Sequence, residues 1–144
     1  DVLSRIPDQE GIVRAFYGRL NTWQRFVTRF GPEHLSEEAQ AGLFAELVLL
    51  EEFVLPRATA ASAIQAWRGP LGEAHDFLLG SLAIEVKGST ASAPQSFRVS
   101  NLQQMECPAG RSLCVSHLTL ELSTATGTTL PEIMERIRSR LGQE

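Results

Sequence analysis

Residues 75–87 read HDFLLGSLAIEVK, and this stretch decides the fold that the chain can adopt. Two short apolar runs, residues 75–79 and 81–87, lie on either side of Gly80, a residue type that favours a tight turn between paired strands. The pattern predicts a β-hairpin whose two strands are these runs. Asp76 opens the first strand, and pairing across the turn brings it beside Glu85.

The second strand has one apolar face and one face that becomes polar toward its end. Side chains alternate between the faces of a strand, so Glu85 and Lys87 share one face and the even-numbered apolar residues share the other. A half-buried strand with a wet side is a common explanation of this pattern. Asp76 strengthens a functional one, because two carboxylates on adjacent strands form a pocket of hard oxygen atoms for Mg²⁺ or Mn²⁺. The main-chain carbonyl of Val86 points the same way and offers a further ligand.

Lys87 is the only lysine in the chain, since every other basic residue is Arg. By residue counts alone, a bias toward Arg explains this equally well as a special role. Beside a metal pocket, however, an ammonium stabilises the anion that builds on a phosphorus centre and helps to polarise a water. Arg is too large and too basic for that position. The pattern therefore predicts that Lys87 takes part in phosphoryl chemistry.

Helices are predicted ahead of the hairpin. Apolar residues at three- and four-residue steps predict a helix over residues 8–30, which a Gly-Pro pair then ends. A second helix begins at Ser36, a good N-cap, and ends at Pro56. An Ala-rich segment over residues 58–67 predicts a third.

The acidic residues of the second helix fall on different sides of it. Glu46 lies about 60° from the centre of the apolar stripe at ~100° per residue, which places it at the border of the buried face. Glu51 and Glu52 are predicted to point outward. An ordinary helix-border acid explains Glu46 as well as a functional role does.

The segments after the hairpin complete a mixed pattern. A strand is predicted over residues 97–100, one helical turn over residues 101–106, and a long strand over residues 113–122 that is covered on both faces. A last helix begins near Thr129, and Gly142 caps it. The order of helices and strands predicts an α/β (α+β) fold, in which one mixed central sheet is flanked by helices.

Composition indicates a globular protein of one domain. The 144 residues are 43% hydrophobic and 21% charged, which argues against a disordered chain, collagen or a disulfide miniprotein. No apolar run approaches the ~20 residues of a membrane span, so we expect no membrane partner and a cytoplasmic location. The net charge of −4 argues against a surface that coats phosphates. Cys107 and Cys114 are compatible with a disulfide. Two small buried thiols in a reducing cytosol agree better with the sequence.

The motifs resemble those of a known superfamily. Asp76 followed by Glu85-Val86-Lys87 resembles the signature of the PD-(D/E)XK nucleases, and GLFAEL at residues 42–47 and WRGP at residues 67–70 narrow the likeness. They are similar to a bacterial group that carries only a domain-of-unknown-function label and often sits beside restriction and phage-defence genes. The resemblance runs from about Leu20 to the C-terminus. It implies a restriction-endonuclease-like core over residues 36–144, with an N-terminal helix packed on it over residues 1–35, in a fragment of a longer protein.

The resemblance also implies roles for single residues. Asp76 and Glu85 match the metal-binding acids, and Lys87 matches the catalytic lysine. Glu46 matches an acid that completes the metal shell from the first core helix. Gln104 resembles a polar residue that touches the water or the phosphate in related nucleases.

The histidines are predicted to be structural. His75 stands where the name of the superfamily has Pro, which many of its members lack. We expect His75 and His117 to be hydrogen-bonded strand residues rather than ligands.

Two functions of different class remain open from the sequence. The first is a Mg²⁺- or Mn²⁺-dependent endonuclease that hydrolyses DNA phosphodiesters in restriction or phage defence. The second is a catalytically silent module that keeps the fold as a binding or scaffold part of a defence complex. The set of Asp76, Glu85 and Lys87 favours the first, while the net charge of −4 favours the second or places DNA binding elsewhere. A homodimer or partners in a defence complex fit either.

Overall fold

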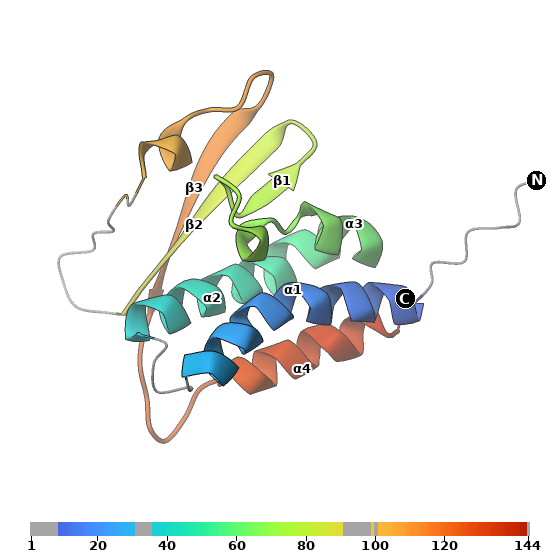
Figure 1. Ribbon diagram of the computed structural model, residues 1–144, viewed down its shortest axis with the longest axis vertical. Helices are drawn as coiled ribbons and strands as arrows, with labels where there is room; N and C mark the ends of the chain where they lie inside the picture. The colour runs from blue at the N-terminus through green and yellow to red at the C-terminus, as the bar shows by residue number, and fades with distance from the viewer. Residues whose placement is uncertain (1–8, 31–35, 91–98, 100, 144) are drawn as a thin grey trace, which may run out of the picture.

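The computed structural model describes residues 9–30, 36–90, 99 and 101–143. Its helices and strands follow the order expected from the sequence (Figure 1). The main elements are α1 (Gln9–Phe30), α2 (Glu37–Leu49), α3 (Ala60–Ala66), β1 (Phe77–Leu79), β2 (Leu82–Thr90), β3 (Ser112–Leu120) and α4 (Leu130–Leu141). Short turns of helix lie between them: η2 (Leu50–Val54), η3 (Leu55–Arg57), η4 (Gly69–Leu71) and η5 (Leu102–Met105).

The strands form one mixed sheet in the order β1-β2-β3. β1 pairs antiparallel with β2, and β2 pairs parallel with β3. Gly80 makes the turn of the hairpin with a φ of 53°, a conformation that residues with a Cβ rarely adopt. The predicted hairpin and the predicted mixed sheet are both confirmed, and the α+β architecture is compatible with a restriction-endonuclease-like fold.

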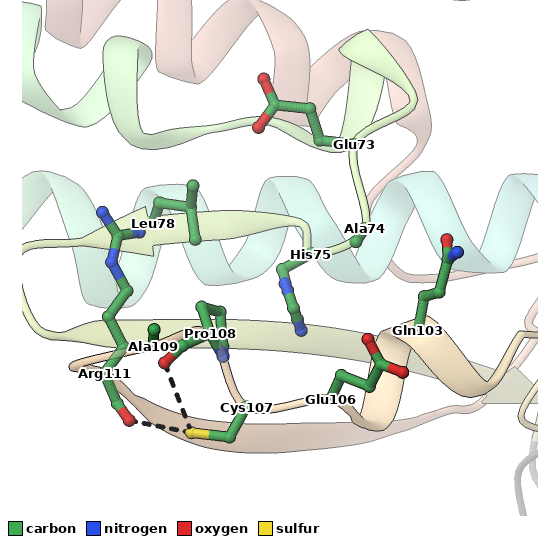
Figure 2. A pocket seen from close by; sticks show the side chains of 10 residues that line it. All are labelled: Glu73, Ala74, His75, Leu78, Gln103, Glu106, Cys107, Pro108, Ala109 and Arg111. Carbon is green, nitrogen blue, oxygen red and sulfur yellow. Dashed lines mark hydrogen bonds between the residues drawn. The ribbon is translucent and has the colours of Figure 1, made fainter.

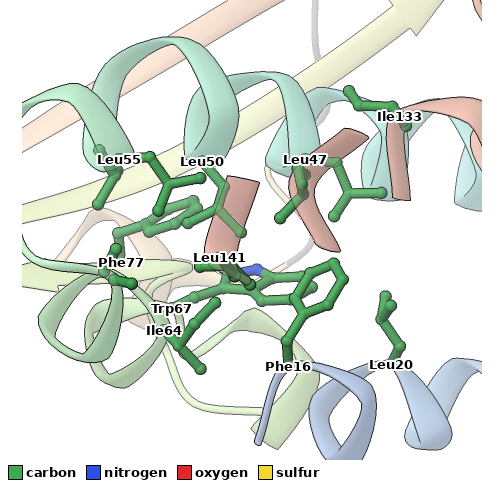
Figure 3. Packing of buried hydrophobic residues seen from close by; sticks show 14 of the residues in the cluster. Phe16, Leu20, Leu47, Leu50, Leu55, Ile64, Trp67, Phe77, Ile133 and Leu141 are labelled. Atoms are coloured by element: carbon green, nitrogen blue, oxygen red, sulfur yellow. The ribbon is translucent and has the colours of Figure 1, made fainter. Parts of the chain in front are cut away.

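The helices build the hydrophobic core on one side of the sheet (Figures 1 and 3). α2 packs directly on β2, and α4 packs on both α2 and α1. The core contains apolar side chains from every layer, among them Phe16 and Leu20 from α1, Leu47 from α2, Phe77 and Ile84 from the sheet, and Ile133, Ile137 and Leu141 from α4. Ile84 and Val86 of β2 belong to this core, whereas Glu85 and Lys87 lie on the opposite face of the strand.

Glu51 corrects the prediction that both acids after α2 point outward. The helix changes from α to π winding at Leu50, and the side chain of Glu51 is buried. Arg136 of α4 donates from Nε and Nη2 to the two carboxylate oxygens at 2.9 and 2.8 Å, and Arg140 donates to the Glu51 carbonyl at 3.1 Å. Such a two-pronged contact between Arg and carboxylate is strong and directional, so it locks α4 to the end of α2. Glu52 is exposed as predicted.

Three further predictions are tested by the described residues. β3 ends at Leu120, and its side chains are exposed or half-buried, so the prediction of a strand covered on both faces is wrong. Cys107 and Cys114 are free and exposed, so they are not the buried thiols we expected. The last helix is confirmed, with a capping box of Thr129 and Glu132. The strand predicted over residues 97–100 lies outside the described residues except for Val99, which is exposed.

Within the described parts of the chain, no helix has both the length and the apolar character that a membrane crossing requires.

The close contact of α2 with β2 gives a test of the fold. A Cβ added to Gly88 would lie 2.3 Å from the Ala41 carbonyl oxygen and 2.9 Å from the Ala45 Cβ. We expect Gly88→Ala to cost about 1–3 kcal/mol of unfolding free energy, because α2 has to move away from the sheet. Gly42→Ala is the matched control, since nothing lies within 4 Å of a Cβ there. It should stabilise the protein by about 0.5–1 kcal/mol through helix propensity. Urea unfolding measures both, and equal effects of the two variants would contradict the packing described.

Candidate active site

The hairpin register places the first two carboxylates opposite each other. Phe77 pairs with Ile84, so the residue before Phe77 faces the residue after Ile84, and these are Asp76 and Glu85. The backbone N–H of Val86 donates to Asp76 Oδ2 at 2.7 Å. This contact replaces the next rung of the ladder at the point where β1 begins. It holds the Asp76 carboxylate at the open end of the hairpin.

Helix α2 brings a third carboxylate to the same place. Glu46 is only 8% exposed, and Trp67 Nε1 donates to its Oε2 at 2.7 Å. A Cβ added to Gly69 would lie 2.2 Å from Glu46 Oε2 and 3.0 Å from Asp76 Oδ1. The two carboxylate oxygens are therefore separated by no more than the sum of these distances. Glu46, Asp76 and Glu85 thus converge, as the sequence predicted, although whether they bind metal stays a prediction.

The segment from Trp67 to Gly69 forms a wall of the site that sequence reasoning missed. The backbone N–H groups of Arg68 and Gly69 donate to the Asp76 carbonyl at 2.7 and 3.1 Å. Arg19 of α1 donates to the Trp67 carbonyl, which ties the wall to the N-terminal helix. Only Gly leaves room for both carboxylates at position 69. The motif WRGP was noticed as a likeness, but nothing in the sequence showed that its indole would bind Glu46.

Burial and mutual repulsion raise the proton affinity of two of these acids. The pKa of Glu46 rises to about 8, chiefly because burial penalises the charged form and secondly because Asp76 lies near; the indole of Trp67 opposes this. Burial also raises the pKa of Asp76 to about 6, against the lowering effect of the Val86 N–H. Without a cation, the cluster therefore holds a proton near neutral pH.

Lys87 lies against the third acid. Its Nζ forms an ion pair with Glu85 Oε1 at 2.7 Å and donates to Gln104 Oε1 at 3.0 Å. Gln104 belongs to η5, so this turn holds the ammonium together with Glu85 of β2. The structure places Gln104 on Lys87, the candidate catalytic lysine, and a contact of Gln104 with the water or the phosphate stays a prediction.

A divalent cation fits the donor set at this site. Glu85 is only 2% exposed, and its Oε2 has no hydrogen-bond partner in the described part of the chain, which leaves a buried anionic oxygen free for a ligand. N–H and C=O of one strand residue point to the same side, so the Val86 carbonyl points toward Asp76 as its N–H does. Carboxylate and carbonyl oxygens are the donors that Mg²⁺ and Mn²⁺ prefer. Among the described residues, no three acidic, His or Cys side chains already stand at metal-ligand spacing. Closing on an ion would therefore require the carboxylates to turn.

The two histidines differ from each other. His117 Nε2 and Ser89 Oγ are hydrogen-bonded at 2.8 Å on β3 and β2, as predicted for a structural His. His75 is buried, but its Nε2 has no hydrogen-bond partner among the residues described, so that part of the prediction is wrong.

Fold and site together describe an α+β protein of restriction-endonuclease-like type with an acidic cluster and a lysine at one end of a hairpin. The model of one protein family matches the chain over residues 1–144, and this family is described as "Putative PD-(D/E)XK family member, (DUF4420)". The chain belongs to this family. No curated protein and no solved structure matches it.

The raised pKa values predict how stability depends on pH when divalent cations are removed. Unfolded carboxyl groups titrate near pH ~4, whereas Glu46 and Asp76 titrate at about 8 and about 6 in the fold. Between these values the folded state binds more protons than the unfolded state, so stability should fall as pH rises from about 5 to about 8. Urea midpoints measured in chelator test this.

Glu46→Gln is the control for the pH series. It removes the larger titration and keeps an acceptor for the Trp67 indole, so the decline with pH should flatten. A wild-type midpoint that rises over this range, or a decline of equal slope in the variant, would contradict the burial of charge described here.

Proposed function

We propose that this chain is the nuclease-like core of a Mg²⁺- or Mn²⁺-dependent enzyme that hydrolyses DNA phosphodiesters. The observation that supports this most directly is the convergence of Glu46, Asp76 and Glu85 beside the only lysine in the chain. Membership in a PD-(D/E)XK family suggests the same chemistry. A role in restriction or phage defence, a cytoplasmic location, and action as a homodimer or within a complex belong to the same proposal. So does the division into an N-terminal helix over residues 1–35 and a core over residues 36–144.

The proposal gives each acidic residue a task. Asp76, Glu85 and Glu46 would hold the cation, with the Val86 carbonyl as a further donor. The ion, when bound, supplies a Lewis acid for the phosphoryl oxygen and lowers the pKa of a water. The Trp67 indole and the Val86 N–H orient the Glu46 and Asp76 carboxylates before any ion arrives. The cluster would give up the proton that it holds near neutral pH when its carboxylates hold a cation.

Lys87 has a different task. Its ammonium, held by Glu85 and Gln104, lies next to the oxygen donors and would stabilise charge that develops on the phosphate in the transition state. Because the ammonium is compact, it fits between a carboxylate and an amide in a space that a planar guanidinium would not fill in the same way. Gln104 acts here as a positioning residue for Lys87.

A catalytically silent scaffold is the second candidate. Two observations favour it: the Lys87 ammonium is already paired with Glu85, and the net charge of −4 opposes a phosphate backbone. The deciding experiment incubates the protein with plasmid, linear and single-stranded DNA, with and without Mg²⁺ or Mn²⁺. Metal-dependent cleavage by the wild type, lost in Glu85→Gln, supports the enzyme. Absence of cleavage on every DNA, with folding and metal binding intact, supports the scaffold.

Substitutions of Lys87 test the mechanism itself. Lys87→Ala removes a preorganised charge and should lower the cleavage rate on the order of 10²–10³-fold. Lys87→Arg keeps the charge but has a bulky, planar head group, so it should restore little. Both variants should still bind Mg²⁺ in titration calorimetry. Full activity of Lys87→Arg would remove Lys87 from the mechanism.

A further inference from the structure

A pocket of about 490 Å³ lies beside the candidate active site (Figure 2). This is within the range of roughly 300–1,000 Å³ that is usual for small-molecule sites. His75 and Leu78 form one wall next to β1, and Gln103, Glu106, Pro108 and Arg111 form the other. Figure 2 shows the imidazole of His75 pointing into the space between β1 and residues 106–108.

The pocket opens on the same face of the sheet as the catalytic candidates. Leu78 pairs with Ala83, and cross-strand partners share a face, so Leu78 lies on the face that carries Glu85 and Lys87. The far wall is joined to the site through η5, because Gln103 lines the pocket while the next residue, Gln104, holds Lys87 Nζ. Neighbouring residues of η5 therefore contact the pocket and the Lys87 ammonium.

The lining favours a group that carries both hydrogen-bond donors and acceptors. Two carboxylates, Glu73 and Glu106, can accept hydrogen bonds and the Arg111 guanidinium can donate them, while Glu73 is also paired with Arg68 at 3.0 Å. His75 is buried, and its Nε2 lacks a hydrogen-bond partner among the described residues, which costs free energy unless a ligand supplies one. Gln103 adds an amide that both donates and accepts.

We propose that this pocket holds one unpaired base of a single-stranded nucleic-acid substrate, next to the phosphodiester presented to Lys87. The inference rests on the proposed function and narrows its substrate class. A base carries exocyclic amino groups for the carboxylates and ring nitrogens for the imidazole, and it is uncharged. Exposed apolar side chains on η5, Leu102 and Met105 at 81% and 43% exposure, offer a surface on which the neighbouring base can rest.

An oligomer that isolates the base tests this proposal. The probe is a chain of about ten abasic deoxyribose phosphates with a single 2-aminopurine at its centre, compared with the same chain without any base. In chelator, where no cleavage occurs, the wild type should bind the base-bearing oligomer about tenfold more tightly, with a change in 2-aminopurine emission. Equal affinities for the two oligomers would overturn the proposal without any variant.

A variant that fills the pocket provides the second arm. Ala109 is exposed and lines the pocket, so Ala109→Trp should abolish the preference for the base-bearing oligomer while binding of the base-free chain is unchanged. Ala125→Trp is the matched control, because Ala125 is an exposed loop alanine between β3 and α4 and lines no part of the pocket. If Ala109→Trp still prefers the base-bearing oligomer, the pocket is not the origin of that preference, and the proposal is overturned.

Two further measurements separate this inference from the proposed function. A DNA single strand with a central 2-aminopurine should bind more tightly than its duplex, and equal binding would overturn the claim that the base is unpaired. Cleavage of DNA with Mg²⁺ is followed in parallel. Cleavage of DNA without any preference for the base-bearing oligomer overturns the proposed role of the pocket alone. A preference for the base-bearing oligomer without cleavage supports the proposed role of the pocket and overturns the proposed nuclease activity.

Discussion

The hydrogen bond from the Val86 N–H to Asp76 Oδ2 is the contact on which the site depends. In the register of the hairpin, the partner of Val86 would be residue 75, but β1 begins only at Phe77, which leaves the Val86 N–H without a partner in the ladder. A side-chain carboxylate satisfies that donor instead. One backbone donor therefore holds an acid in position opposite Glu85.

The electrostatic state of the site follows from this convergence. Three carboxylates share a region from which water is largely excluded, and such groups cannot all be ionised without a compensating charge. The protein meets this in two ways: it raises the pKa of Glu46 and Asp76, and it pairs Glu85 with Lys87. The cluster can therefore release a proton when a divalent cation binds. Its carboxylates can also turn so that their oxygen atoms face the cation.

The helical layer determines whether Glu46 can reach the cluster at all. α2 approaches β2 closely because Gly88 has no side chain in the way, and the contact of Glu51 with Arg136 holds the far end of α2 against α4. Trp67, fully buried in the core (Figure 3), supplies a hydrogen bond to the Glu46 carboxylate. The same residue thus belongs to the core by its ring and to the site by its N–H.

The sequence by itself determined the hairpin, the helices and the face on which Glu85 and Lys87 lie, because these depend on periodicity and on one turn glycine, which are local properties. It also indicated that Glu46 stands at the border of a buried face. Only the tertiary structure decided that Trp67 and Gly69 enclose Glu46 and Asp76, that Gln104 holds Lys87, and that Glu51 is buried against Arg136. The sequence wrongly predicted that β3 is covered on both faces and that both cysteines are buried, and only the placing of the layers showed otherwise. These features bring together segments that are far apart in the chain. Their approach depends on how whole layers pack, and a periodic pattern within one segment does not contain that information.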